Sequence, residues 1–324
     1  MPEILILGRE EIRAALDMPS LIDAVEQAFT AYSAGRAELP SVIHLDVPEH
    51  EGEIHIKAGY VHGGPHFAVK VASGFPGNEA SGVPPSNGMV MVFDAATGAS
   101  AAILFDGGHI TDARTGAAGA VAARHLAPTA PRAVAVIGTG VQARQQVHAL
   151  SHVRRFEEVR IWGRNADRAE GCAHDVRSLE VVASGGVVRV AASVREAVEG
   201  ADIVITVTAS RDALVKADWL APGVHVTAVG SDGPDKQELH PDVLARADLV
   251  VADSVAQCVR MGEIHHAVAA GLLKEEEVVE LGAVTADRHP GRTADEEITL
   301  CDLTGLGVQD VAAATLVMER MGEL

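Results

Sequence analysis

The sequence is poor in aromatic, cysteine and basic residues. Aromatic side chains account for only 3% of the 324 residues although 48% are apolar, so Ala, Val, Leu and Ile must build the core. The three cysteines, Cys172, Cys258 and Cys301, stand far apart, which disfavours a disulfide framework or a CxxC site. Against 45 acidic residues there are 26 basic ones, and a net charge of −19 disfavours binding to nucleic acid or to anionic membranes.

Long hydrophobic runs are also missing. No run approaches the ~18 apolar residues of a membrane span, and the first residues lack the basic segment and cleavage site of a signal peptide. Together with the cysteine usage, this leads us to expect a cytoplasmic location. A charged fraction of 22% fits a folded chain, and a length of 324 residues predicts two domains at ~150 residues each.

The first part of the chain mixes helix and strand patterns. Apolar residues at helical spacing predict a helix over residues 20–34, with Ser20 as N-cap and Gly35 as the stop. Alternating or continuous apolar runs predict strands at 54–60, 67–72, 88–94 and 101–105. A small-residue helix is expected at 112–125. Pro128 and Pro131 then mark a domain boundary.

After Pro131, strands and helices alternate. Strands are expected at 133–137, 159–162, 187–190, 203–207, 224–229, 249–252 and 298–301, and helices at 141–150 and 166–179. This alternation predicts a parallel sheet covered on both faces. The helix expected at 309–320 returns to the first domain. We therefore predict one domain from residues 1–128 plus 304–324, and a second from residues 129–303.

A glycine-rich turn follows the strand at 133–137. Gly138, Gly140 and Ala143 fit the G-x-G-x-x-G/A fingerprint of a Rossmann dinucleotide site: a tight turn, a close approach to a pyrophosphate, and helix–strand packing. The helix N-terminus supplies N–H donors and partial positive charge, and Thr139, Val141 and Gln142 complete the loop. We predict that this loop binds a dinucleotide; the alternative is a purely structural glycine turn.

The end of the next strand bears on which dinucleotide binds. NAD sites usually place Asp or Glu there, against the ribose, but residues 162–165 read Trp-Gly-Arg-Asn. Arg164, helped by Arg168, could hold a 2′-phosphate. The sequence therefore favours NADP over NAD; a solvent-facing arginine is the alternative.

Three further residues suit chemistry at a small polar substrate. Lys70 lies in an apolar strand, where burial would lower its pKa and let it assist proton transfer; it could equally face solvent. Asp232 follows the strand at 224–229, at the sheet edge where ligands bind, although an ordinary Asp-Gly turn has the same sequence. Arg114, among Gly and Ala, suits a carboxylate or phosphate, unless it pairs with an acid such as Asp112.

The 15 histidines raise the question of a metal site. The segment from His50 to His55 has one residue too many for HExxH, and the other histidines form no recognised spacing. We expect no metal.

The sequence resembles the ornithine cyclodeaminase/mu-crystallin family. The matching segments are FAVKVASGFPGN (67–78), GHITDARTGAAGAVAARHLA (108–127), VAVIGTGVQARQQ (134–146), VGSDGPDKQEL (229–239) and CDLTGLGVQD (301–310). Within the family, HIKAGYV (55–61), ADWLAPGVHVTAVGSD (217–232) and GEIHHAVAAGL (262–272) resemble the ectoine-utilisation branch.

The resemblance implies an α/β fold, in which a Rossmann NAD(P)-binding domain joins an α+β substrate-binding and dimerisation domain. It implies a homodimer with its active site in the cleft between the domains. Lys70 and Asp232 then match the catalytic residues of the family, and Arg114 its carboxylate-binding arginine. Ser86, Thr115, Thr208 and Ser231 join the glycine loop and Arg164 as expected cofactor contacts.

One departure concerns the substrate. Many family members carry a second carboxylate-binding arginine after a proline, but here Pro40 is followed by Ser41, Val42 and Ile43. Lys57 is the candidate replacement, because it shares a strand face with His55 and Gly59. This change argues against ornithine itself as the substrate.

The resemblance implies hydride transfer between a nicotinamide and Cα of a small amino or imino acid. Hydrolysis of the resulting imine describes an amino-acid dehydrogenase, attack by a side-chain amine a cyclodeaminase, and the reverse reaction an imine reductase. A different class also fits: an NADPH-dependent small-molecule binding protein of mu-crystallin type, which would not need both Lys70 and Asp232.

Overall fold

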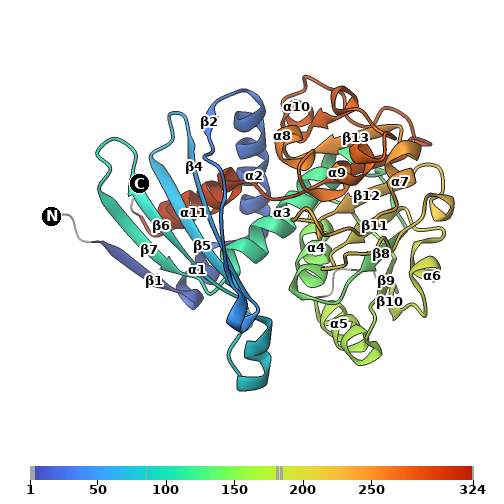
Figure 1. The fold of residues 1–324 in the computed structure, drawn as a ribbon, viewed down its shortest axis with the longest axis horizontal. Coiled ribbons are helices and arrows are strands. Elements are labelled where there is room, and N and C mark those ends of the chain that lie inside the picture. The colour runs from blue at the N-terminus through green and yellow to red at the C-terminus, as the bar shows by residue number, and fades with distance from the viewer. Residues whose placement is uncertain (1–3, 85, 180–181, 183–184, 323–324) are drawn as a thin grey trace. The chain divides into compact units, whose positions relative to one another are not determined.

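The structure is a computed structural model that describes residues 4–84, 86–179, 182 and 185–322. The chain forms two compact units (Figure 1). Unit 1 comprises Met1–Arg114 and Leu306–Leu324, and unit 2 comprises Thr115–Gly305. Within the described part of the chain, no helix combines the length and the apolar character that crossing a membrane requires.

Unit 1 is built on a mixed sheet. Its order is β1-β7-β6-β5-β4-β2, with β3 also paired to β4; β1 and β7 are parallel and the other neighbours antiparallel. The strands are β1 (Leu5–Gly8), β2 (Ala37–Glu38), β3 (Ile43–Val47), β4 (Gly52–Val61), β5 (His66–Gly74), β6 (Ser86–Asp94) and β7 (Ser100–Phe105). The helices are α1 (Arg9–Ala15), α2 (Met18–Ser33) and α11 (Gly307–Arg320), with short 3₁₀ turns η1 (Pro48–His50) and η2 (Pro76–Ser81).

The two faces of this sheet differ. On the inner face, α11 packs against α2, β4 and β5 over buried Ala68, Val90 and Leu104. This approach requires small residues, because a Cβ on Gly59 would lie 3.1 Å from the carbonyl carbon of Gly307. The outer face, as we call the opposite side, carries apolar side chains that are 51–61% exposed; they are Ile6, Ile43, Leu45 and Phe105.

The first long helix begins earlier than predicted. Asp17, not Ser20, is the N-cap of α2, because its Oδ1 accepts a hydrogen bond from the Ser20 backbone N–H at 3.0 Å. The predicted stop is confirmed, since Gly35 follows the helix with φ of +66°. The strands expected at 54–60, 67–72, 88–94 and 101–105 correspond to β4, β5, β6 and β7. β2 and β3 have no counterpart among the expected strands.

Unit 2 contains a parallel sheet in the order β10-β9-β8-β11-β12-β15-β13-β14. The strands are β8 (Ala133–Ile137), β9 (Glu158–Trp162), β10 (Val187–Val190), β11 (Ile203–Thr206), β12 (His225–Ala228), β13 (Leu249–Ala252), β14 (Val279–Glu280) and β15 (Thr299–Asp302). The helices are α3 (His109–Leu126), which starts in unit 1, α4 (Val141–Ser151), α5 (Ala166–Ser178), α6 (Val194–Val198), α7 (Pro241–Arg246), α8 (Val255–Cys258), α9 (Gly262–Ala269) and α10 (Leu281–Thr285), with turns η3 (Ala217–Trp219) and η4 (Glu275–Glu277).

Two apolar cores lie on the two faces of this sheet. Val134 and Val136 of β8 pack with residues of α4 and α5. The alternate residues Ala135 and Ile137 pack with residues of α6, α7 and α9. The prediction of a parallel sheet covered on both faces is therefore confirmed, and the fold is Rossmann-like.

The units divide at a different point from the predicted domains. The predicted boundary follows residue 128, whereas the compact units separate after Arg114, within α3. Residues of α3 beyond this point pack in unit 2: a Cβ on Gly116 would lie 2.9 Å from the backbone oxygen of Gln145 on α4. At the other end, unit 2 extends to Gly305, and α11 belongs to unit 1.

Candidate active site

A buried charge cluster lies on the inner face of unit 1. Lys70 on β5 is 3% exposed, and its Nζ donates a hydrogen bond to Oδ1 of Asp310 at 2.9 Å. The Nε of Arg114, on α3, donates to the same oxygen at 3.1 Å. A second arginine nitrogen donates to Oε1 of Gln309. The first turn of α11 thus holds both cations in place.

Positive charge dominates this cluster. Burial lowers the pKa of Lys70 to about 8; Asp310 opposes this shift, and Arg114 and Lys57 add to it. Burial also acts to raise the pKa of Asp310, but the charges of Lys70 and Arg114 outweigh it and lower that pKa overall. Lys57 lies opposite Lys70 in the β4–β5 register. Three cations around one carboxylate favour an anionic ligand.

Two polar atoms of the cluster have hydrogen-bonding capacity left. Oδ2 of Asp310 and Nε2 of Gln309 are buried and have no hydrogen-bond partner among the described residues. Buried polar atoms are nearly always hydrogen-bonded, so an acceptor and a donor are available here for a polar ligand. Together with the cations, these atoms are chemically complementary to a small molecule that carries a carboxylate and a nitrogen.

The glycine loop of unit 2 has the geometry of a dinucleotide site. Gly138 has φ of +134°, and a Cβ there would lie 2.7 Å from the carbonyl oxygen of Val207. Gly140 is the N-cap of α4, which has no side-chain cap, and a Cβ on Gly140 would meet no heavy atom within 4 Å. The first turn of α4 therefore presents N–H groups that a phosphate can use. Ala143 is fully buried, as the motif requires.

Arg144, which the sequence analysis missed, braces this loop. It donates hydrogen bonds to the backbone oxygens of Thr139 at 2.8 Å and Gly140 at 3.0 Å, and to Oδ2 of Asp175 at 2.7 Å. Thr139 also packs against Gly163, where a Cβ would lie 2.4 Å from the threonine methyl group. The residues present fit a bound pyrophosphate.

The tip of β9 carries no acidic residue. Arg164 is exposed there, and Asn165 caps α5 by accepting a hydrogen bond from the backbone N–H of Arg168 at 2.9 Å. Asp167 is the acidic residue in the first turn of α5. An exposed guanidinium at this position is suited to a phosphate on the ribose.

A buried carboxylate joins the loops after β11 and β12. Glu238 accepts hydrogen bonds from the backbone N–H groups of Thr208 and Gly230, the latter at 2.8 Å, and burial raises its pKa to about 7. Glu263 in turn accepts from the backbone N–H of Glu238 at 2.7 Å. These contacts fix the backbone on either side of Asp232.

Ser231 and Asp232 differ in their surroundings. Ser231 is 1% exposed and donates its hydroxyl to the backbone oxygen of Lys236 at 2.6 Å. Asp232 is exposed, and its Oδ1 lies 2.6 Å from Nζ of Lys236. The Asp232 carboxylate is therefore exposed and has a cationic neighbour, Lys236, that is not among the predicted site residues.

Apart from Ser86, the predicted residues fall into one group in each unit. Lys57, Lys70 and Arg114 gather around Asp310 in unit 1, and Arg114 pairs with that acid rather than with the alternative partner, Asp112. Ser86 is exposed at the start of β6. In unit 2 the candidates follow three neighbouring strands; they are Gly138, Thr139, Gly140, Val141 and Gln142 after β8, Thr208 after β11, and Ser231 and Asp232 after β12, with Arg164 after β9 and Thr115 on α3.

Four further residues of the site were not predicted from the sequence, and most of them are hydrogen-bond or ion-pair partners of residues that were. Asp310 and Gln309 end the segment CDLTGLGVQD, and Lys236 and Glu238 lie in VGSDGPDKQEL. Both segments are among those that resemble the family, so the resemblance pointed to these stretches without assigning the individual residues. Their roles depend on contacts over as many as 240 positions, as between Lys70 and Asp310, which spacing does not show.

Comparison with known proteins finds similarity over nearly the whole chain. The ornithine cyclodeaminase/mu-crystallin family matches residues 3–323. An uncharacterized cyclodeaminase of Sinorhizobium fredii, y4tK, is 43% identical over 331 residues, covering 100% of this chain and 97% of its own.

Two solved structures are also similar. Thermococcus litoralis Delta(1)-pyrroline-2-carboxylate reductase, in complex with NADH and L-proline, superposes with a TM-score of 0.91 at 32% identity, covering 99% of this chain and 98% of its own. An archaeal alanine dehydrogenase dimer with bound NAD has a TM-score of 0.89 at 33% identity, covering 99% and 96%.

Proposed function

Because the chain belongs to the ornithine cyclodeaminase/mu-crystallin family, we propose that it is an NAD(P)(H)-dependent oxidoreductase acting at Cα of a small amino or imino acid. Its reaction is the reduction of an imine or the oxidation of an amino acid. The buried cluster of Lys70, Arg114 and Asp310 is the observation that carries this proposal. It offers cationic donors and, in the same place, a carboxylate oxygen that has no hydrogen-bond partner among the residues described.

Arg114 binds the substrate carboxylate in this proposal. Its guanidinium is held by Asp310 and Gln309, so little conformational entropy is lost on binding. Lys57 adds positive charge from the neighbouring strand, in the role that a second arginine fills in many family members. Pairing of buried cations with one substrate carboxylate is strong because the surroundings exclude water.

Lys70 and Asp232 handle the protons. A pKa of about 8 lets Lys70 donate a hydrogen bond to the imine nitrogen or to an adjacent water, and exchange a proton near neutral pH. Asp232 moves the proton that accompanies reduction or oxidation. The nicotinamide supplies or accepts the hydride, and the protein positions the reactants.

For the cofactor, we propose that the glycine loop at residues 138–142 holds the pyrophosphate and that Ser86, Thr115, Thr208 and Ser231 contribute further contacts. The similar structures named above contain NADH or NAD. In this chain the absence of an acid at residues 162–165 and the exposed Arg164 support a preference for NADP(H).

We also propose a homodimer that forms through unit 1. The outer face exposes Ile6 and Phe105 at the β1–β7 end of the sheet, and Ile43 and Leu45 on β3 at the other end, and these exposed apolar side chains support an interface there. A similar structure is a dimer. Unit 1 then serves substrate binding and dimerisation, and unit 2 binds the cofactor. Light scattering at micromolar concentration tests this, and a monomer contradicts it.

The experiment that tests the function follows the absorbance of reduced nicotinamide. NADPH and NADH are supplied in turn with cyclic ketimines, and with pyruvate or oxaloacetate plus ammonia or methylamine. Steady oxidation that Lys70→Met abolishes supports the proposal. Ammonia release from diamino acids without net oxidation would identify a redox-neutral cyclodeaminase instead. Cofactor binding without either reaction would identify a binding protein. Placement in the ectoine-utilisation branch stays a prediction.

A further inference from the structure

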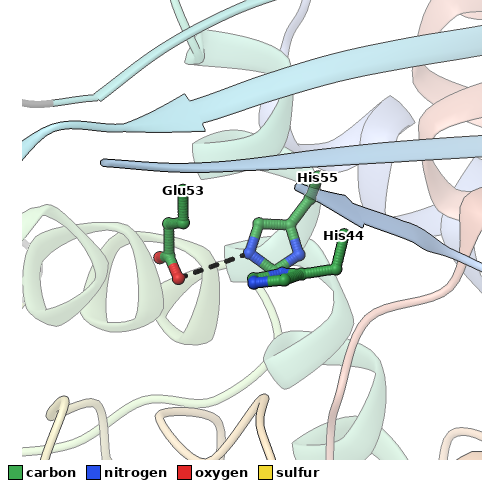
Figure 2. A group of neighbouring side chains, drawn as sticks. All are labelled: His44, Glu53 and His55. Atoms are coloured by element: carbon green, nitrogen blue, oxygen red, sulfur yellow. Dashed lines mark ion pairs between the residues drawn. The ribbon is translucent and has the colours of Figure 1, made fainter. Parts of the chain in front are cut away.

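The register of β3 and β4 gathers metal-binding side chains from two strands. His44 pairs directly with His55, and Asp46 with Glu53. Residues that are paired or two positions apart lie on the same face of a sheet. Figure 2 shows the side chains of His44, Glu53 and His55 extending to one side of the strands. This pairing joins two strands, so the spacing of histidines along the sequence does not reveal it.

The side chains are close enough to share one ion. One ligand atom from each of His44, Glu53 and His55 lies within 4.8 Å of the others. Nε2 of His55 is 3.6 Å from Oε2 of Glu53, and the two imidazole rings are 4.6 Å apart between centroids. In a tetrahedral site with bonds of ~2.0–2.1 Å, ligand atoms stand about 3.3 Å apart. The side chains are 31–47% exposed, so small rotations reach this geometry.

We propose that His44, Glu53 and His55 bind a divalent first-row transition metal ion, with Zn²⁺ the best match. Two imidazole nitrogens and one carboxylate oxygen are a common zinc ligand set, whereas Mg²⁺ and Ca²⁺ prefer oxygen ligands alone. Oδ1 of Asp46 lies 2.9 Å from Nε2 of His44, and this partner can hold the ring while Nδ1 faces the metal. Three protein ligands leave a coordination position for water.

The site has a defined place in the fold. Glu53, His55 and Lys57 are alternate residues of β4 and share its inner face. The ion would therefore lie beside Lys57, the next residue along this face of β4. It would also link β3 to β4 through side chains from both strands. This inference concerns a second site, and its test does not depend on the oxidoreductase activity.

The test measures Zn²⁺ binding to the full chain after treatment with a chelator. Isothermal titration with ZnCl₂ and metal analysis after dialysis are run on wild type, on the double variant His44→Gln/His55→Gln, and on Glu53→Gln. The matched control is His148→Gln/His152→Gln, because these two imidazoles of unit 2 also lie close, with Nε2 atoms 3.4 Å apart. Circular dichroism checks that each variant folds.

We expect one Zn²⁺ per chain in wild type and in the control pair. The His44/His55 variant should lose this ion, and Glu53→Gln should weaken binding roughly tenfold or more. Zn²⁺ should raise the melting temperature of wild type but not of the His44/His55 variant. The proposal is overturned if wild type retains no zinc, if the His44/His55 variant binds as wild type does, or if the control pair alone loses the ion. MgCl₂ should produce no response.

Discussion

Replacing Lys70 by methionine should remove a defined pH dependence of stability. The pKa of Lys70 falls from 10.5 to about 8 in the folded chain, with burial as the main cause. Between these two pH values the unfolded chain binds more protons than the folded chain, so stability rises with pH. Each pH unit is worth about 1.36 kcal/mol. The unfolding free energy should therefore rise by about 2 kcal/mol between pH 8 and 9.5 because of Lys70. Below pH 8 the buried ammonium destabilises the folded chain to its full extent.

Urea denaturation followed by far-UV circular dichroism measures this effect. The quantity of interest is the unfolding free energy of wild type minus that of Lys70→Met, because other titrating groups cancel in the difference. Tryptophan fluorescence reports on unit 2, where Trp162 and Trp219 lie, and so separates the two units if they unfold independently. A difference that stays constant from pH 8 to 9.5 would refute the assignment of Lys70 as a buried, destabilised ammonium.

Four further substitutions test the site. Arg114→Lys should raise KM for the amino or imino acid by ~10–100-fold, with a smaller change in kcat, because one or more charge-assisted hydrogen bonds are lost; an unchanged KM would exclude Arg114 from carboxylate binding. Gly140→Ala should keep the melting temperature, since φ is −77° and no atom lies within 4 Å of the new Cβ, yet weaken NAD(P)H binding measured by fluorescence titration; unimpaired binding would contradict the pyrophosphate site. Arg164→Ser should lower affinity for NADPH but not NADH, and equal affinities in wild type at fixed salt would contradict the NADP preference. Asp232→Asn should reduce kcat by ~10²–10⁴-fold without changing cofactor binding, and near-normal turnover would remove the role given to this residue.

Much of unit 2 follows from local sequence. Strands β8 and β13 begin and end where the apolar runs do, because all their residues are apolar and nearly all are buried. The glycine loop is also predictable from local sequence. Gly138 has φ of +134°, a backbone conformation that residues with a Cβ rarely adopt, so a glycine at this position indicates the turn.

The secondary structure of unit 1 is harder to predict from local sequence. The strand β3 is short, and its residues Ile43 to Asp46 are all exposed, so no buried pattern marks it. Its existence depends on pairing with β4. The start of α2 was misplaced because Ser20 and Asp17 are both good N-cap residues, and only the backbone decides between them.

The charge cluster also depends on contacts that local sequence does not reveal. Lys70 and Arg114 were identifiable from their apolar neighbours, because a charged group in such surroundings needs a reason to be there. Their shared partner Asp310 lies 240 and 196 positions away, on a helix that returns to unit 1 from the end of the chain. Only the packing of α11 on the sheet brings the three together.

The origin of the hydrogen at Cα tests the central claim most directly. Nicotinamide cofactor carrying deuterium at C4, on each face in turn, is incubated with the protein and an accepted imine, and the product is analysed by mass spectrometry and proton NMR. Hydride transfer predicts one deuterium at Cα from one of the two labelled cofactors, and much slower formation of this deuterated product in Lys70→Met and Asp232→Asn. An amino-acid product without deuterium from either labelled cofactor would contradict the account.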